Sequence, residues 1–300
     1  MQVLQCNQVF KSIKGKAILK DFTFSIQAGE IVGLVGPNGA GKTTLMRLIT
    51  GLSRASGGSI SIKTMNIEQQ FAGYIKEVGA IIETPLFYPY LTGYQCLNYY
   101  AKLRRVSQER LHAVVQLLGL SEAIHKKVKA YSLGMRQRLG LAQAVLAEPS
   151  LLILDEPFNG LDPSGVAELR ETLKNMAGAG TAVFLSSHTL NELEAICDRA
   201  ILMNQGELLQ IKELGADTSE GLVNMSVATT DDTQALALIK KHFGAVQIRQ
   251  EHTLILSGTR PDTFADILLM LREHNIKVVQ MKEERNSLEN TFMTLIGGKP

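Results

Sequence analysis

The feature that most constrains the fold of this chain is a glycine-rich loop, which lies between an apolar run and a helix-forming run. Residues 36–44 read GPNGAGKTT, after IVGLV at 31–35 and before LMRLI at 45–49. The order strand, loop, helix and the spacing from Gly36 to Gly41 match the phosphate-binding loop G-x-x-x-x-G-K-[ST]. We therefore predict a site for a nucleoside triphosphate. Its binding residues are expected to be Gly36, Pro37, Asn38, Gly39, Ala40, Gly41, Lys42, Thr43 and Thr44.

Each residue type in this loop has a physical reason to be there. Glycines let the backbone turn tightly and bring its N–H groups close to phosphate oxygens. The following helix start adds unpaired N–H donors and a partial positive charge. Lys42 is expected to reach the β- and γ-phosphates of ATP, and the Thr43 hydroxyl to ligate Mg²⁺.

A second motif carries two adjacent carboxylates. The apolar run Leu151–Leu154 is typical of a strand buried on both faces, and it is followed by Asp155 and Glu156. On a strand these two side chains would point to opposite sides. We predict that Asp155 holds Mg²⁺, directly or through water, and that Glu156 is the general base for an attacking water. The alternative, a strand that ends in solvated acids, is disfavoured by the neighbouring glycine loop.

Composition excludes several classes of protein. The chain has 300 residues and a net charge of +2, which does not indicate a nucleic-acid-binding face. Its three cysteines are far apart and predict neither a disulfide framework nor a zinc site, so a reduced, cytosolic setting is expected. No apolar run approaches the roughly 20 residues that cross a bilayer. If the protein serves transport, another chain must supply the pore.

Alternating strands and helices predict an α/β fold with a mainly parallel sheet. Short strands are expected before residue 30, at 57–62 and at 74–82, and a helical segment at about 84–147. Thr92 and Gln95 have the spacing of a capping box, and Asp162 before Pro163 is typical of a helix start.

The end of the chain shows a different pattern. Residues 214–221 are interpreted as a linker between an ATPase domain at 1–213 and a C-terminal domain at 222–300. The expected order strand, helix, strand, strand, helix, strand is a ferredoxin-like α+β arrangement, with a last helix from Ser287. No catalytic constellation is present there, so a small accessory domain for docking or regulation is expected.

Three further segments resemble one family. Residues 131–138, YSLGMRQR, are similar to a signature that usually reads LSGGQ: Ser132 and Gly134 match, whereas Leu133 and Met135 depart. Residues 158–162, FNGLD, resemble a loop that crosses a dimer interface, and residues 186–188, SSH, a switch histidine segment. With the glycine loop and the two acids, the chain resembles the ATPase subunit of an ABC transporter. The resemblance covers residues 1 to about 212 closely.

This resemblance implies an ABC-type P-loop fold with an antiparallel β subdomain and a helical subdomain. It implies that Ser132, Gly134 and Met135 contact the γ-phosphate held by a second subunit, with Asp162 at the interface and His188 donating to the γ-phosphate. A dimer of ATPase subunits is therefore expected. A homodimer is favoured, and pairing with a relative is left open. Membrane-spanning permease subunits are the implied partners, which would place the chain on the cytoplasmic face of the membrane.

Two positions depart from the family pattern. Ile13 stands where an aromatic residue usually stacks on adenine, and Phe10 is a possible substitute. Glu83 stands where Gln usually touches Mg²⁺ or its water. We expect Glu83 to contact ATP and the metal ion, and we interpret it as the link between ATP and the membrane partner.

Glu83 and the following TPLFYP resemble the ATPases of lantibiotic self-protection and bacitracin-resistance exporters. A lantibiotic exporter subunit is the preferred interpretation, and a general drug or bacitracin exporter is the alternative. A soluble ABC-type ATPase acting on ribosomes or DNA is disfavoured, since no second ATPase domain or long coiled-coil insertion is present. A regulatory subunit without efficient hydrolysis is disfavoured by Glu156.

Overall fold

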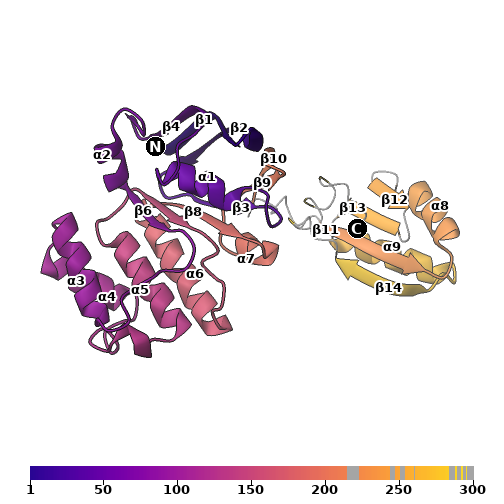
Figure 1. Ribbon diagram of the computed structural model, residues 1–300. Helices are drawn as coiled ribbons and strands as arrows, with labels where there is room; N and C mark the ends of the chain where they lie inside the picture. The colour runs from indigo at the N-terminus through magenta and orange to yellow at the C-terminus, as the bar shows by residue number, and fades with distance from the viewer. Residues whose placement is uncertain are drawn as a thin grey trace. The chain divides into compact units, whose positions relative to one another are not determined.

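The computed structural model describes residues 1–214, 223–243, 247–250, 254–259 and 261–283, together with Leu288, Phe292 and Leu295. The chain divides into two compact units, Met1–Leu214 and Gly215–Pro300, which are described separately (Figure 1). Among the described residues, no helix is both long enough and apolar enough to cross a membrane.

The N-terminal unit is built on a ten-stranded sheet with the order β5-β4-β1-β2-β10-β9-β3-β8-β7-β6. Its parallel part consists of β6 (Val78–Ile81), β7 (Leu151–Leu154), β8 (Ala182–Ser187), β3 (Ile31–Val35) and β9 (Arg199–Asn204). Strands β3, β7 and β8 are buried along their whole length. Such strands need a covering layer on both faces, which explains why their sequences are continuously apolar.

The other part of the sheet is antiparallel. It contains β1 (Gln2–Ile13), β2 (Lys16–Gln27), β4 (Gly57–Ile62) and β5 (Met65–Asn66). Strand β10 (Glu207–Glu213) joins it to the parallel part, because β10 pairs antiparallel with β9 and parallel with β2. Strands β1 and β2 have twelve residues each, so they are longer than the short strands that the sequence predicts. Register shifts along β1 let one long strand bend across the sheet.

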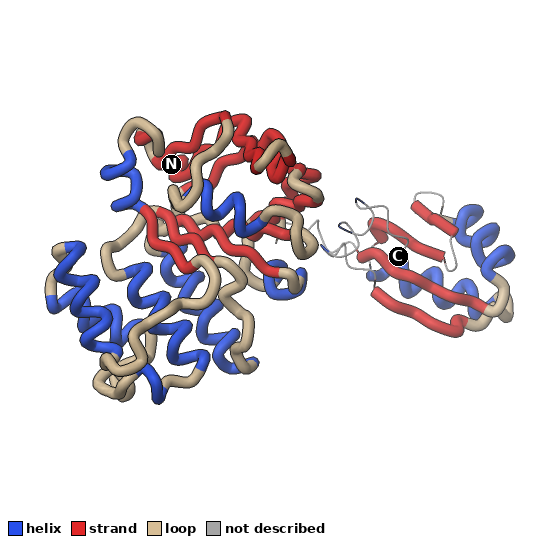
Figure 2. Tube along the Cα trace, viewed as in Figure 1, coloured by secondary structure: helices blue, strands red, loops and turns tan. Residues whose placement is uncertain are grey.

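Helices cover the parallel strands (Figure 2). Those of the N-terminal unit are α1 (Lys42–Ile49), α2 (Phe71–Tyr74), α3 (Gly93–Arg104), α4 (Gln108–Leu117), α5 (Leu133–Val145), α6 (Pro163–Gly178) and α7 (Leu190–Glu194). The predicted caps are confirmed: Thr92 and Gln95 form a capping box at α3, and Asp162 caps α6 with Pro163 in its first turn. Three of these helices, α3 to α5, form the predicted helical segment.

The strand predicted at 74–82 begins only at Val78. Phe71–Tyr74 is a short helix and Ile75–Glu77 a 3₁₀ turn. Tyr74 is fully buried, and its hydroxyl donates to the Ile49 carbonyl at 2.7 Å. That hydrogen bond fixes Tyr74 against the end of α1, because a buried hydroxyl without a partner would be costly.

The main core lies between the two halves of the sheet and α1. Phe24 of β2 and Phe184 of β8 pack with their ring centroids 5.6 Å apart, and Leu34, Leu45 and Met46 beside them are fully buried. Burying one such side chain contributes about 1.5–3 kcal/mol. This packing holds the ends of β3 and α1, and hence the loop between them, in a fixed place.

The C-terminal unit has the predicted ferredoxin-like order of elements: β11 (Val223–Thr229), α8 (Asp232–His242), β12 (Gln247–Gln250), β13 (Leu254–Thr259), α9 (Pro261–Glu273) and β14 (Val278–Glu283). Its sheet is antiparallel with the order β12-β13-β11-β14. Its core includes Ile239 of α8, Leu254 of β13 and Ile267 of α9. The proposed linker after Leu214 and most of the helix expected from Ser287 lie outside the described residues.

Candidate nucleotide-binding and hydrolytic site

The glycine loop forms one wall of a cavity of about 310 Å³ at the start of α1. The cavity is lined by Ile18, Pro37, Asn38, Gly39, Ala40, Gly41, Lys42, Thr43, Thr44, Asp155 and Glu156. Because β3 and β7 are neighbours of β8 in the same sheet, their carboxyl ends bring the loop and the two acids together.

Two glycines of this loop are required by space and by conformation. A Cβ atom at Gly36 would lie 2.5 Å from the Met203 carbonyl oxygen. Gly41 has φ +109° and a Cβ there would lie 2.8 Å from a methyl carbon of Leu19. Any other residue would push the loop away from β9 or β2 and distort the cavity.

The backbone of the loop presents donors to the cavity. Within the described part of the chain, the N–H groups of Gly39 and Gly41 have no protein acceptor, whereas that of Ala40 donates to Pro37. The start of α1 adds the N–H groups of its first turn. Free donors at a helix N-terminus favour a bound anion such as a phosphate.

Lys42 supplies the positive charge of the site. Its side chain is buried, and its Nζ donates to the Gly36 carbonyl at 2.6 Å and lies 3.8 Å from Glu156 Oε1. A buried ammonium group needs such partners. The amine is thus held between the loop and the acid, where a phosphate oxygen would find it.

Asp155 is held by two hydroxyl groups. Thr43 Oγ1 donates to its Oδ2 at 2.8 Å, and Ser186 Oγ donates to its Oδ1 at 2.6 Å. The same Ser186 oxygen accepts the Glu156 backbone N–H at 2.9 Å. Ser186 therefore orients both acids, a role that the sequence did not assign to it. The parallel register pairs Leu154 with Leu185. The residues that follow them, Asp155 and Ser186, therefore lie next to each other at the edge of the sheet.

Glu156 does not lie on a strand, and the prediction that the two acids alternate along one is wrong. Strand β7 ends at Leu154, and Glu156 has the left-handed φ of +50°. Its Oε2 accepts the His188 backbone N–H at 3.2 Å and lies 2.7 Å from His188 Nδ1. Backbone strain of this kind is held only where surrounding contacts enforce it. Here it turns the Glu156 carboxylate toward Lys42 and the cavity.

Thr43 and Asp155 have the chemistry of a Mg²⁺ site. Both offer oxygen atoms, which are the ligands that Mg²⁺ prefers, and they already contact one another. Among the described residues, no group of three or more His, Cys, Asp or Glu side chains could hold a metal by itself. The residues present fit a cation that takes its remaining ligands from a nucleotide and from water.

The signature residues do not line this cavity. Ser132 caps α5, because its Oγ accepts the Met135 N–H at 3.2 Å. Gly134 packs beside Leu161: a Cβ atom at Gly134 would lie 3.4 Å from a methyl carbon of Leu161. Asp162 accepts the Gly165 N–H at 2.9 Å. The structure thus joins the signature to the loop at 158–162 and keeps both apart from Lys42 of the same chain.

Glu83 and the proposed adenine contacts are also outside the cavity lining. Glu83 is exposed and pairs with Arg47 of α1, so its role as an ATP or metal contact stays a prediction. Phe10 packs on Gly57 of β4, and Ile13 is about half exposed. Ile18, which the sequence analysis did not single out, is the residue of this region that lines the cavity.

Comparison with known proteins identifies close relatives. The family model described as "ABC transporter" matches residues 19–159. The chain is 38% identical over 297 residues to the uncharacterized ABC transporter ATP-binding protein YhcH of Bacillus subtilis, covering 98% of this chain and 96% of that protein.

The names of two relatives state which compound the transporter carries. Bacitracin transport ATP-binding protein BcrA of Enterococcus faecalis is 32% identical over 298 residues, covering 99% of this chain and 97% of that protein. Lantibiotic transport ATP-binding protein SrtF of Streptococcus pyogenes is 35% identical, covering 75% of this chain and 97% of that protein.

A solved structure shows the same fold. It is described as an ATP-binding subunit of an ABC transporter and has a TM-score of 0.66 and 26% sequence identity. The similarity covers 90% of this chain and 99% of that chain. The predicted P-loop fold of the ABC type is therefore confirmed.

Proposed function

Because the chain belongs to the ABC transporter ATP-binding family, we propose that it energises an exporter whose membrane-spanning part is formed by other chains. As a member of this family it binds and hydrolyses ATP. The observation that carries the proposal is the joint placement of Lys42, Asp155 and Glu156 around one cavity. Glu156→Gln tests it directly, because only the charge of the proposed base changes.

Each residue of the site has a different role in ATP hydrolysis. Glu156 accepts the proton of the attacking water, and His188 holds its carboxylate in place. Lys42 and the loop N–H groups bind the phosphates and stabilise the charge that develops on them. Asp155 and the Thr43 hydroxyl would hold Mg²⁺, which neutralises phosphate charge when bound.

A second ATPase subunit would complete the site. Ser132, Gly134 and Met135 lie outside the cavity of their own chain. Ser132 opens α5, whose first N–H groups favour a phosphate. A facing copy could place this helix start over the γ-phosphate, so we favour a homodimer. Sedimentation of the Glu156→Gln variant with ATP tests this: a monomer at saturating ATP would contradict it.

Membrane-spanning partners would dock on the segment that follows Glu83. Leu86 is 90% exposed, and Tyr88, Tyr90 and Tyr99 are each more than 60% exposed. Large exposed apolar side chains in one segment are typical of an interaction surface. Docking there would hold the chain at the cytoplasmic face of the membrane and connect α3 to the permease. The C-terminal unit, without a site of its own among its described residues, would serve as an accessory domain.

Antimicrobial peptides of the lantibiotic class are the proposed cargo. The names of SrtF and BcrA support lantibiotic export and its alternative, bacitracin export. The test is the sensitivity of the source strain after deletion of the gene, with wild-type or Glu156→Gln chain restored. Lantibiotic sensitivity rescued only by the wild-type chain supports the proposal. Sensitivity to bacitracin alone favours the alternative, and no change in either overturns both.

A further inference from the structure

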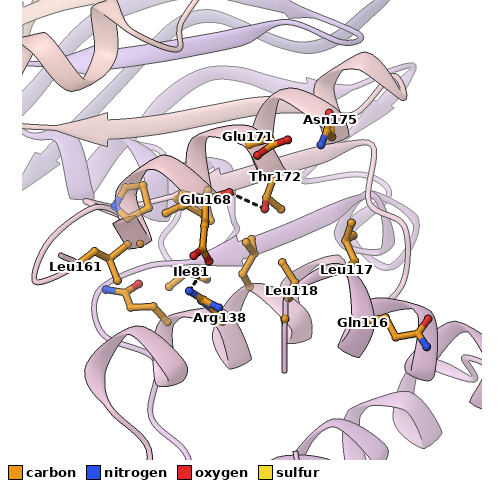
Figure 3. A pocket seen from close by; sticks show the side chains of 17 residues that line it. Ile81, Gln116, Leu117, Leu118, Arg138, Leu161, Glu168, Glu171, Thr172 and Asn175 are labelled. Carbon is orange, nitrogen blue, oxygen red and sulfur yellow. Dashed lines mark hydrogen bonds and ion pairs between the residues drawn. The ribbon is translucent and has the colours of Figure 1, made fainter. Parts of the chain in front are cut away.

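A second cavity lies behind the catalytic acids, between the helical segment and α6. Its volume is about 350 Å³, within the range of small-molecule sites. In Figure 3, Thr172 and Asn175 of α6 lie across the cavity from Leu117 and Leu118 at the end of α4. Glu168 of the same helix points toward Arg138 of α5. None of its lining residues lines the nucleotide cavity.

Some residues that line this cavity are adjacent in the sequence to residues of the hydrolytic site. Leu154 and Pro157 line it, and they flank Asp155 and Glu156 in the sequence. Leu161, which precedes Asp162, also lines it. A molecule seated here would touch both ends of the segment that carries the acids, so its binding would be coupled to their position.

The inner wall of the cavity is apolar. Its floor is formed by the almost fully buried Leu118, Leu141 and Leu154. Its accessible apolar surface is that of Ile81, Leu161 and Leu169, which are partly exposed, and of Leu117, which is 47% exposed. An apolar ligand body of suitable size would therefore displace water from this wall at a gain of about 25 cal/mol per Å² of buried apolar area.

The rim of the cavity has an excess of negative charge. Its charged residues are Arg138, Glu168 and Glu171. Arg138 Nη2 pairs with Glu168 Oε2 at 2.6 Å, and within the described part of the chain the Glu171 side chain makes no ion pair or hydrogen bond. The end of α4, which contributes Gln116 and Leu117, adds the partial negative charge of a helix C-terminus.

We propose that this cavity is a regulatory site for a small amphipathic cation, with an aromatic or branched apolar body and one ammonium or guanidinium group. The apolar body packs on the accessible side chains of Leu117 and Leu169 above the Leu154 floor, and the cation lies near Glu171. A bound ligand contacts α5 and α6 together, so any rearrangement between them would break its contacts. Turnover of ATP therefore slows when the site is filled.

Binding is tested with three probes of one shape: naphthalen-2-ylmethylammonium, naphthalen-2-ylmethanol and 2-naphthoate. Titration calorimetry uses the full chain with saturating ADP, which occupies the nucleotide cavity. The cation is expected to bind with a dissociation constant below about 1 mM, and the alcohol about fivefold more weakly, the upper end for an exposed charge pair. The anion is expected not to bind. Equal affinity for all three probes would overturn the proposal.

Two variants locate the probe. Glu171→Gln is expected to weaken the ammonium probe about fivefold and to leave the alcohol unchanged. Thr172→Trp, which places a large ring in the cavity, is expected to abolish binding of both. Glu122→Gln removes an exposed carboxylate that does not line the cavity and is the matched control. Unchanged binding in Glu171→Gln, or loss in Glu122→Gln, contradicts the assignment.

Regulation is tested by the rate of phosphate release from ATP. The ammonium probe is expected to lower kcat of the wild-type chain and of Glu122→Gln, and to act about fivefold more weakly on Glu171→Gln. Binding without any change in kcat would overturn the regulatory role. If Thr172→Trp is poorly folded, the charge dependence in Glu171→Gln still decides the result.

Discussion

Arg47 of α1 holds the carboxylate of Glu83 one helical turn beyond Thr43. Residues four apart lie on the same face of a helix, so the pair lies along the face that carries the Thr43 hydroxyl. Glu83 has the left-handed φ of +66°, and the side chains of Arg47 and Glu83 are 46% and 63% exposed. The glycine-loop helix is thereby connected to the segment that carries the exposed tyrosines.

Two roles of Glu83 can be distinguished by mutation: stabilising the fold through its ion pair with Arg47, and coupling ATP to the membrane partner. An exposed ion pair contributes only about 0–1 kcal/mol to stability, so Glu83→Ala is expected to leave the melting temperature nearly unchanged. If Glu83 itself couples ATP to the membrane partner, Glu83→Ala lowers transport and the ATPase rate of the assembled exporter. Transport into vesicles and phosphate release measure the two effects.

Arg47→Gln is the matched control, because it removes the ion pair and keeps the carboxylate. It is expected to retain most of the transport that Glu83→Ala loses. Equal losses in both variants would show that the pair, rather than Glu83 alone, matters. Transport and ATPase activity that both stay at wild-type levels in Glu83→Ala would refute the coupling role.

Glu156→Gln is expected to lower the turnover number for ATP by about 100-fold or more, the usual contribution of a positioned general base. The amide keeps the size of the side chain and cannot take a proton from water. Binding of ATP should persist, since Lys42 and the loop are unchanged. Phosphate release and equilibrium nucleotide binding on the same preparation separate the two effects, and wild-type turnover would refute the base assignment.

Ser186→Ala is expected to reduce both stability and turnover. It would leave Asp155 Oδ1 and the Glu156 N–H, which Ser186 now bridges, without their partner. Such a loss at a buried position costs about 1–3 kcal/mol. Urea unfolding measures the change, and Ser164→Ala, at an exposed hydroxyl on α6, is the control. A variant as stable as this control would contradict the bridging role.

Local patterns in the sequence predicted local features of the structure well. The glycine loop, the capping box at Thr92 and the cap at Asp162 each depend on residues within a few positions of one another. The ferredoxin-like order of the C-terminal elements also follows from the lengths of consecutive apolar segments. These features need no knowledge of which strands become neighbours.

Contacts between segments that are distant in the chain could not be predicted from the sequence. The bridging role of Ser186 requires the register between β7 and β8. The pairing of Glu83 with Arg47 requires the path of the chain after β6. The left-handed backbone of Glu156 is imposed by contacts with residues 186 and 188, and no local propensity favours it.

Glu77 connects the antiparallel and the parallel parts of the fold. Its Oε2 accepts from Lys63 Nζ at 2.8 Å, and also from the Ser150 hydroxyl. Burial alone would raise the pKa of Glu77, but hydrogen bonds from Lys63 and Ser150, together with the Lys63 charge, lower it below its usual value. A carboxylate whose pKa is lowered by folding stabilises the folded state at neutral pH.

Glu77→Gln is therefore expected to lower the free energy of unfolding at pH 7 by about 1 kcal/mol, a value kept small by the partial exposure of the side chain. The sign of the pH dependence follows from the lowered pKa. The contribution is fully present above the unfolded-state value of about 4.3, and it disappears as pH falls through the folded-state value. The two proteins should become equally stable in acid.

Urea unfolding of wild-type chain and Glu77→Gln between pH 7 and the lowest pH at which both stay folded measures this dependence. Glu68→Gln removes an exposed carboxylate that contacts neither Lys63 nor Ser150, and it should track the wild-type curve throughout. If the deficit of Glu77→Gln stays constant as the pH drops below 4, lost packing explains it. The ionised hydrogen bonds from Lys63 and Ser150 would then contribute nothing to stability.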